Sequence, residues 1–167
     1  QGGNNDKAIA DFKAAVDRGA SDGKIFQLLG TAQFEKGTYE EALQNLERAI
    51  SFQLSDSNLY KNAAIASQNL NRNEGAITYF KKAISVGAKS PGVFQQYAIL
   101  LYETGNTQEA KINIERAMSA GASGEKLLLY KGYLAVADKN WDVAISSLQK
   151  AKDAGVKEPG LYSALGK

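Results

Sequence analysis

Few residues of this chain are of the types that carry out acid–base or nucleophilic chemistry. The sequence has no histidine and no cysteine, so it lacks the commonest general base and metal ligand and the thiol nucleophile. The nearest paired carboxylates are Glu40 with Glu41 and Asp17 with Asp22. Each pair lies at the expected start or end of a helix, where acids are commonly solvated or cap the helix terminus. We therefore predict no enzyme activity, with no catalytic, cofactor-binding or metal-ligating residues.

Motifs and charge also disfavour phosphate binding, nucleic-acid binding and membrane insertion. Residues 19–24 place three residues between two glycines where a Walker phosphate loop has four, and Ile25 replaces its Ser or Thr. The 20 Lys and Arg are nearly balanced by 18 Asp and Glu, so we expect no basic face for nucleic acid. The longest apolar runs are short, such as 127–129, and predict no membrane insertion.

A pattern that repeats every 34 residues organises the chain instead. Alanines recur at this spacing, at Ala8, Ala42, Ala76, Ala110 and Ala144. A large apolar residue follows four residues later, at Phe12, Leu46, Phe80, Ile114 and Leu148, and a second alanine three beyond that, at Ala15, Ala49, Ala83, Ala117 and Ala151. These spacings form one face of a helix on which small residues allow a close neighbour. Five copies without insertion predict a helical repeat array.

Each repeat also predicts a first helix before this one. With the first alanine counted as position 20, position 4 is large (Phe26, Tyr60, Phe94, Leu128, Tyr162) and position 8 is small (Gly30, Ala64, Ala98, Gly132, Gly166). The break between the two helices falls at Gly37, Asn71, Gly105 and Lys139, mostly residues that tolerate a left-handed backbone. Glycines end the second helix at Gly19, Gly87, Gly121 and Gly155. Gln53 replaces this glycine once, and there we expect a longer or differently capped helix.

The pattern closely resembles the tetratricopeptide repeat, a 34-residue helix–turn–helix unit. The resemblance implies an all-α, right-handed superhelical solenoid of antiparallel helix pairs. We expect four complete repeats, at 23–56, 57–90, 91–124 and 125–158. Residues 1–22 would be the second helix of a truncated preceding repeat, and 159–167 the start of a truncated following one. The usual proline at position 32 and aromatic residue at position 11 are absent, which affects local packing.

The C-terminal residues predict an uncovered end. Leu161, Tyr162 and Leu165 would have no following helix to pack on, and repeat arrays need polar caps for solubility. We infer a segment of a longer array; the alternative is a natural terminus that frays at its last turn.

The resemblance also implies a binding groove. First helices of such arrays line a concave surface that binds peptide or helical segments, chiefly through positions 2, 5, 9, 12 and 13. The groove residues expected from these positions are Lys24, Gln27, Thr31, Phe34, Lys61, Ile65, Gln68, Gln95, Ile99, Tyr102, Lys126, Leu129 and Tyr133. For Leu129 packing between helices remains equally open, whereas we expect Tyr102 and Tyr133 to be exposed. Members that clamp chaperone C-termini use a set of Lys, Asn and Arg that is incomplete here.

We therefore predict a non-catalytic protein-interaction scaffold with an unidentified protein or peptide partner. Two alternatives stay open: self-association through the ends of the array as a homo-oligomer, and a targeting arm of a larger enzyme or of a bacterial envelope secretion complex. The absence of cysteine fits a bacterial periplasmic or envelope protein, but it fits a cytoplasmic one as well.

Overall fold

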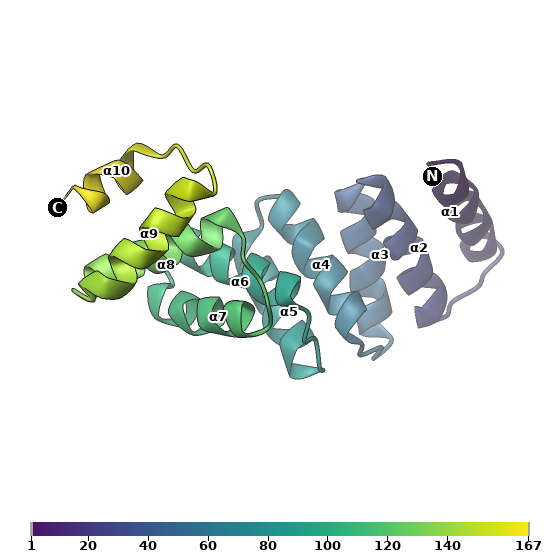
Figure 1. Ribbon diagram of the computed structural model, residues 1–167. Helices are drawn as coiled ribbons and strands as arrows, with labels where there is room; N and C mark the ends of the chain where they lie inside the picture. The colour runs from purple at the N-terminus through teal and green to yellow at the C-terminus, as the bar shows by residue number, and fades with distance from the viewer. Residues whose placement is uncertain (1, 167) are drawn as a thin grey trace. The chain divides into compact units, whose positions relative to one another are not determined.

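The computed structural model describes residues 2–166 and places the side chains of residues 5–166. Within this part of the chain, all regular structure is α-helical (Figure 1). The chain divides into two compact units, Gln1–Ala88 and Lys89–Lys167. The predicted all-α repeat array is confirmed.

The described part of the first unit contains five helices. They are α1 (Gly2–Asp17), α2 (Gly23–Lys36), α3 (Tyr39–Ser51), α4 (Ser57–Asn69) and α5 (Asn73–Ser85). The closest pairs are α2 with α3 and α4 with α5, each joined by a short turn (Figure 1). Helix α1 packs on α2, and α3 packs on α4, so the pairs stack on one another.

The second unit contains the other described helices. They are α6 (Pro91–Glu103), α7 (Thr107–Ser119), α8 (Glu125–Ala137), α9 (Trp141–Asp153) and α10 (Pro159–Leu165). Helices α6 and α7 form one pair and α8 and α9 another, while α10 packs on α9 and α8 (Figure 1). The first helices of the pairs begin at the residues where the sequence places repeat starts, although the division into repeats itself stays a prediction.

Side-chain caps fix where most first helices begin. The Asp22 carboxylate accepts a hydrogen bond from Lys24 N at 2.8 Å, and Asp56 accepts from the first-turn amides of α4 at 2.8 and 2.9 Å. Ser90 Oγ accepts from Val93 N at 3.3 Å. These bonds satisfy amides that a helix N-terminus leaves without a partner.

A residue with left-handed backbone separates the helices of each pair, as predicted. The φ angles are +85° at Gly37 and +81° at Gly105, but also +57° at Asn71 and +58° at Lys139. The turn geometry therefore recurs even where a side chain makes that backbone unfavourable.

The expectation of a longer or differently capped helix at Gln53 is wrong. Helix α3 has 13 residues, as α5 does, and Gln53 itself takes the left-handed conformation with φ of +63°. Its amide bonds to the Ile50 carbonyl at 2.8 Å, just as Gly87 N bonds to Ile84 O at 3.1 Å. The backbone bonds that close the helix are thus kept, and the glutamine carries the steric cost that a glycine avoids.

Small residues allow the paired helices to approach closely. The repeat alanines buried at these contacts are Ala42, Ala76, Ala110 and Ala144. A Cβ added to Gly30 would lie 2.9 Å from Leu46 Cγ and 3.0 Å from two backbone atoms of α3. A Cβ added to Gly132 would lie 2.5 Å from Leu148 Cγ. The predicted alternation of small and large residues therefore describes real contacts between α2 and α3 and between α8 and α9.

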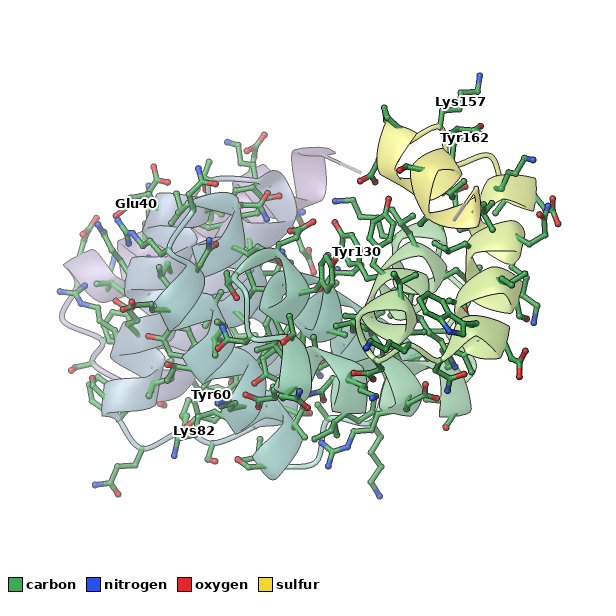
Figure 2. All side chains as sticks on the ribbon, turned by 90° about the vertical axis from the view of Figure 1, so that its left-hand side faces the viewer. Glu40, Tyr60, Lys82, Tyr130, Lys157 and Tyr162 are labelled. Carbon is green, nitrogen blue, oxygen red and sulfur yellow. The ribbon has the colours of Figure 1, made fainter. Side chains whose placement is uncertain are left out.

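The prediction of an uncovered C-terminal helix is wrong for one of its three residues. Leu161 is fully buried, because α10 turns back to pack it against Leu129 and Leu148. Leu165 is partly buried in the same cluster. Tyr162 remains 49% exposed on α10 (Figure 2).

Candidate functional site

Two of the acidic residues that drew attention in the sequence, Glu40 and Asp22, have structural partners. Glu40 accepts two hydrogen bonds from Arg72 Nη2, at 3.0 and 2.9 Å, which link α3 to the start of α5. Asp22 caps α2. Among the described residues, no group of acidic side chains has the geometry to hold a metal ion. No described helix is long and apolar enough to cross a membrane.

In the first unit, the expected groove residues lie on α2 and α4. Gln27 is buried: its Nε2 donates to Asp56, and its Oε1 accepts from Lys24 Nζ at 2.9 Å. Gln27 thus ties α2 to the start of α4 and is not available to a partner, which corrects its assignment to the groove. Thr31 and Phe34 are partly buried, and the Phe34 ring meets the Tyr39 ring edge-on at 5.8 Å.

None of the three expected residues of α4 is fully buried. Lys61, Ile65 and Gln68 are all partly buried on this helix. Lys61 Nζ donates to Asn58 Oδ1 at 3.0 Å, a contact within α4. The first unit therefore presents a mixed surface of amide, ammonium and aliphatic groups.

In the second unit, three tyrosines gather on α6 and α8. The rings of Tyr102 and Tyr130 are stacked, with centroids 4.1 Å apart and planes inclined by 17°. Glu103 Oε1 accepts from Tyr130 OH at 2.9 Å and from Lys126 Nζ at 2.8 Å. Tyr130 is labelled in Figure 2. The Glu103 carboxylate thus holds both the hydroxyl of the stacked Tyr130 ring and the neighbouring Lys126 ammonium.

The third ring lies one turn along α8. Tyr133 OH donates to Glu158 Oε1 at 3.4 Å, and a Cβ on Gly160 would lie 2.7 Å from the same hydroxyl. The glycine at the start of α10 therefore leaves room for the tyrosine. We call Tyr102, Tyr130 and Tyr133, with Glu103 and Glu158, the tyrosine surface.

Burial and carboxylates hold these phenols in the neutral form. Burial, followed by the nearby Glu158 carboxylate, raises the pKa of Tyr133 to about 12. Burial and the hydrogen bond to Glu103 raise the pKa of Tyr130, and burial with Glu158 raises that of Tyr102. A partner thus meets uncharged rings whose hydroxyls remain hydrogen-bonding groups.

The remaining expected groove residues differ in their exposure. Gln95 and Ile99 are partly buried on α6, and Lys126 is exposed on α8. Leu129 is only 2% exposed, because it packs with Leu148 in the core of α8, α9 and α10. Leu129 is therefore a core residue, and its assignment to the groove was wrong.

The groove residues predicted from the sequence did not include Tyr130. It occupies repeat position 6. The residue at the same position two repeats earlier is Asn62, which is buried. Repeat position alone therefore does not distinguish exposure here. Its aromatic type was the only available signal, and that signal is equally typical of a core residue.

Comparison with known protein families agrees with the observed helical repeat fold. Two family models, both described as tetratricopeptide repeat, match residues 1–58 and 58–86. The chain belongs to the tetratricopeptide repeat family. Proteins of this family are generally non-catalytic scaffolds, and the family and the fold together indicate a protein–protein interaction scaffold. No curated protein sequence gives a significant match.

Several solved structures share the fold at low sequence identity. YrrB, described as a TPR protein with an unusual peptide-binding site, is 18% identical with a TM-score of 0.80, over 99% of this chain and 85% of YrrB. MamA is 16% identical with a TM-score of 0.77, over 90% of this chain and 88% of MamA. The pilF protein of Pseudomonas aeruginosa is 21% identical with a TM-score of 0.72, over 92% and 70%.

Proposed function

We propose that the tyrosine surface binds a segment of a protein partner and that the chain works by binding and not by turnover. The observation that carries this proposal is the stacked, partly buried pair of Tyr102 and Tyr130 beside Tyr133 on first helices of the second unit. Rings held in one conformation lose little entropy on binding, and their hydroxyls remain able to hydrogen-bond.

The chemistry of the surface favours a particular kind of segment. Glu158 places a carboxylate next to the rings, whereas the Glu103 carboxylate is already paired with Lys126. An arginine or lysine of the partner would meet a ring face and a carboxylate together, a combination that stabilises a cation. We therefore expect a segment with a basic residue next to an apolar one.

The first unit offers a separate set of proposed peptide-binding residues. These are Lys24, Thr31, Phe34, Lys61, Ile65 and Gln68, and the second unit adds Gln95, Ile99 and Lys126 to the tyrosines. Within the first set, Lys24, Thr31, Lys61 and Gln68 suit contacts to peptide backbone and polar side chains, whereas Phe34 and Ile65 suit apolar ones.

Affinity capture from a lysate of the native host, followed by mass spectrometry, tests the proposal. Wild type is compared with Tyr102→Ala/Tyr133→Ala, after circular dichroism shows that both are equally helical. A Tyr162→Ala variant is the matched control, because this tyrosine is half-exposed on α10 outside the tyrosine surface. The proposal expects a protein that wild type and Tyr162→Ala retain and the double variant loses. Equal retention by all three would contradict it.

Self-association is a second candidate that one observation favours. Trp141 and Ile145 lie one turn apart on α9 and are 55% and 58% exposed. Large apolar side chains this exposed are typical of contact surfaces. Light scattering tests this candidate: the mass should rise with concentration for wild type and stay monomeric for Trp141→Ser/Ile145→Ser. A monomer at all concentrations in wild type would exclude it.

A further inference from the structure

The two carboxylates of the tyrosine surface differ in whether they already hold a cation. Glu103 Oε1 accepts from Tyr130 OH at 2.9 Å and from Lys126 Nζ at 2.8 Å. Glu158 Oε1 accepts from Tyr133 OH at 3.4 Å, but it has no ion-pair partner among the described residues. The tyrosine surface therefore contains one carboxylate whose charge the described part of the chain leaves unpaired.

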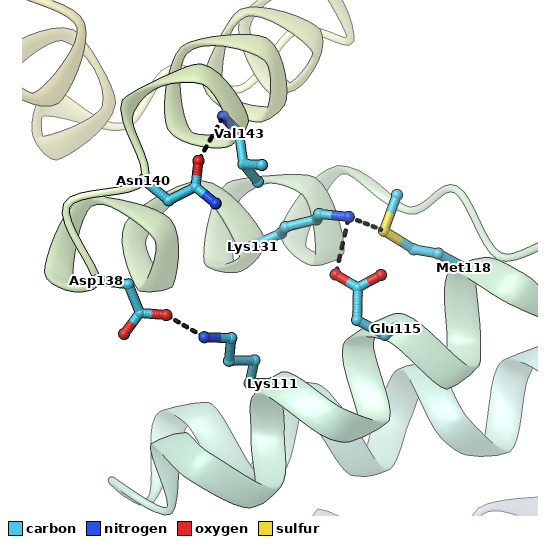
Figure 3. Close-up of polar contacts among 7 residues, drawn as sticks. All are labelled: Lys111, Glu115, Met118, Lys131, Asp138, Asn140 and Val143. Atoms are coloured by element: carbon cyan, nitrogen blue, oxygen red, sulfur yellow. Dashed lines mark hydrogen bonds and ion pairs between the residues drawn. The ribbon is translucent and has the colours of Figure 1, made fainter.

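Two other carboxylates of the second unit are paired in the same way as Glu103 (Figure 3). Lys111 of α7 pairs with Asp138, which follows α8. Lys131 Nζ of α8 lies 2.9 Å from Glu115 Oε1 of α7. A partner cation would have to displace a lysine of the chain at each of these carboxylates, whereas at Glu158 it would displace none.

Glu158 also does not cap its own helix. The residues at the same repeat position, directly before the first helices, include Asp22, Asp56 and Ser90. Each of these side chains accepts a hydrogen bond from a first-turn amide. Glu158 precedes α10 but makes no such bond, and its exposed carboxylate meets the hydroxyl of Tyr133 instead. The carboxylate is thus not used to begin α10 and stays available to a ligand.

The Glu158 carboxylate lies within electrostatic reach of all three rings. After burial, it raises the pKa of Tyr102 and of Tyr133. It also raises the pKa of Tyr130, after burial and Glu103. The planes of the stacked rings are inclined by only 17°, so their outer faces are nearly parallel. A cation on such a face is attracted by the ring and by the carboxylate together.

We propose that the tyrosine surface selects one arginine side chain of the partner segment, whose guanidinium lies against a tyrosine ring and donates hydrogen bonds to Glu158. This selection rests on the proposed function, since it specifies which residue of the partner the same surface binds. A planar guanidinium stacks on an aromatic face and keeps its N–H groups in one plane, where they can reach a carboxylate at the ring edge. A lysine ammonium is a compact, more strongly hydrated charge, so it gains less from the same two contacts.

The lysines around the surface limit it to a single partner cation. Lys126 already occupies Glu103, and its side chain is 62% exposed. Lys157, labelled in Figure 2, directly precedes Glu158 and is exposed as well. A second positive group of the partner would be repelled by these ammonium groups. The selected segment therefore carries one arginine among neutral residues and not a basic cluster.

Blocked amino acids test the proposal on the full chain. N-acetyl-arginine N-methylamide is titrated into wild type, and the ring signals of Tyr102, Tyr130 and Tyr133 are followed by NMR. We expect these signals to shift. The citrulline analogue, which has a similar shape and no charge, should bind at least about tenfold more weakly. The lysine analogue should bind at least about threefold more weakly than the arginine analogue.

A charge-removing variant connects the binding to Glu158. Glu158→Gln should bind the arginine analogue about tenfold more weakly, because the amide keeps the shape of the side chain and loses its charge. Since Glu158 caps no helix, we expect this variant to be as helical as wild type by circular dichroism. Glu115→Gln is the matched control, because it removes the same charge from α7, outside the tyrosine surface, and it should bind like wild type.

Several results would overturn the proposal. They are equal affinity for the arginine and citrulline analogues, no shift with the arginine analogue, and undiminished binding by Glu158→Gln. Ring signals that shift when wild type alone is concentrated would also overturn it, because a second copy of the chain would then occupy the surface.

The capture experiment separates this proposal from the proposed function. A protein that is lost by Tyr102→Ala/Tyr133→Ala but fully retained by Glu158→Gln would support partner binding and contradict the arginine. Equal retention by wild type and the tyrosine variant would contradict the proposed function itself.

Discussion

Replacement of Gly30 by alanine tests the close approach of α2 and α3. The added Cβ would lie 2.9 Å from Leu46 Cγ and 3.0 Å from Ala42 O and Leu46 N. Two of these three atoms belong to the backbone of α3, so a change of side-chain rotamer cannot relieve the clash. The two helices must instead move apart, and the buried contacts between them loosen.

The expected loss in the free energy of unfolding is the difference between two opposing contributions. Overpacking at a close helix contact costs about 1–3 kcal/mol. Alanine in a helix is favoured over glycine by about 1 kcal/mol. The net loss for Gly30→Ala is therefore about 1 kcal/mol, and at most about 2 kcal/mol.

Gly75→Ala is the matched control in the same unit. Its added Cβ would find Ser67 Oγ as the nearest atom, at 3.8 Å, which is ordinary contact. We expect this variant to gain up to about 1 kcal/mol from helix propensity alone. The two melting temperatures should then differ by about 4–8 °C, as followed by circular dichroism. A Gly30→Ala variant as stable as Gly75→Ala would refute the close contact of α2 and α3.

Further predictions follow from single positions. Gln53→Gly should raise the free energy of unfolding by about 1 kcal/mol, because glycine takes the left-handed backbone without steric cost, and Gly87→Gln should lower it by a similar amount. Leu46→Ala should lower it by about 2–5 kcal/mol through an open cavity, and Ala76→Leu by about 1–3 kcal/mol through overpacking. Urea unfolding measures all four. Tyr133, whose pKa is raised to about 12, should contribute stability that is complete below about pH 10 and is lost between pH 10 and 12, since the unfolded chain releases this proton first. Ultraviolet titration should show one phenol fewer ionising between pH 10 and 12 in Tyr133→Phe than in wild type.

Distinct results would contradict these expectations. A Gln53→Gly variant with an unchanged urea midpoint would mean that the left-handed glutamine carries no strain. An unchanged midpoint for Ala76→Leu would mean that α5 and its paired helix are not in close contact. Identical titration curves for wild type and Tyr133→Phe between pH 10 and 12 would contradict the raised pKa.

Most of the fold could be predicted from the sequence because the same pattern of small and large residues occurs in five repeats. Ala42 and Ala76 are buried where the spacing predicts, and Gly37 takes the left-handed backbone that ends a helix. The error at Gln53 has a physical cause: the backbone hydrogen bonds of the cap outweigh the preference of a single side chain. Leu161 was wrongly expected to be uncovered, since a short α10 is enough to bury it against Leu129.

The candidate site was harder to predict from the sequence because the exposure of a side chain depends on its neighbours in other helices. Gln27 is buried and bonds to Asp56, which lies 29 residues away in the sequence. The stack of Tyr102 on Tyr130 joins two helices at unequal repeat positions, 12 and 6.

The most direct test of the binding account locates the partner segment on the chain. A peptide selected from a random library by the wild-type protein is titrated calorimetrically into wild type and Tyr102→Ala/Tyr133→Ala, and hydrogen exchange with mass spectrometry maps protection on wild type. The account predicts at least about tenfold weaker binding by the double variant, the loss of about 1.4 kcal/mol or more that two truncated aromatic contacts imply. It also predicts protection on α6 and α8. Unchanged affinity, with protection confined to α7 and α9, would contradict the assignment of partner binding to the tyrosine surface.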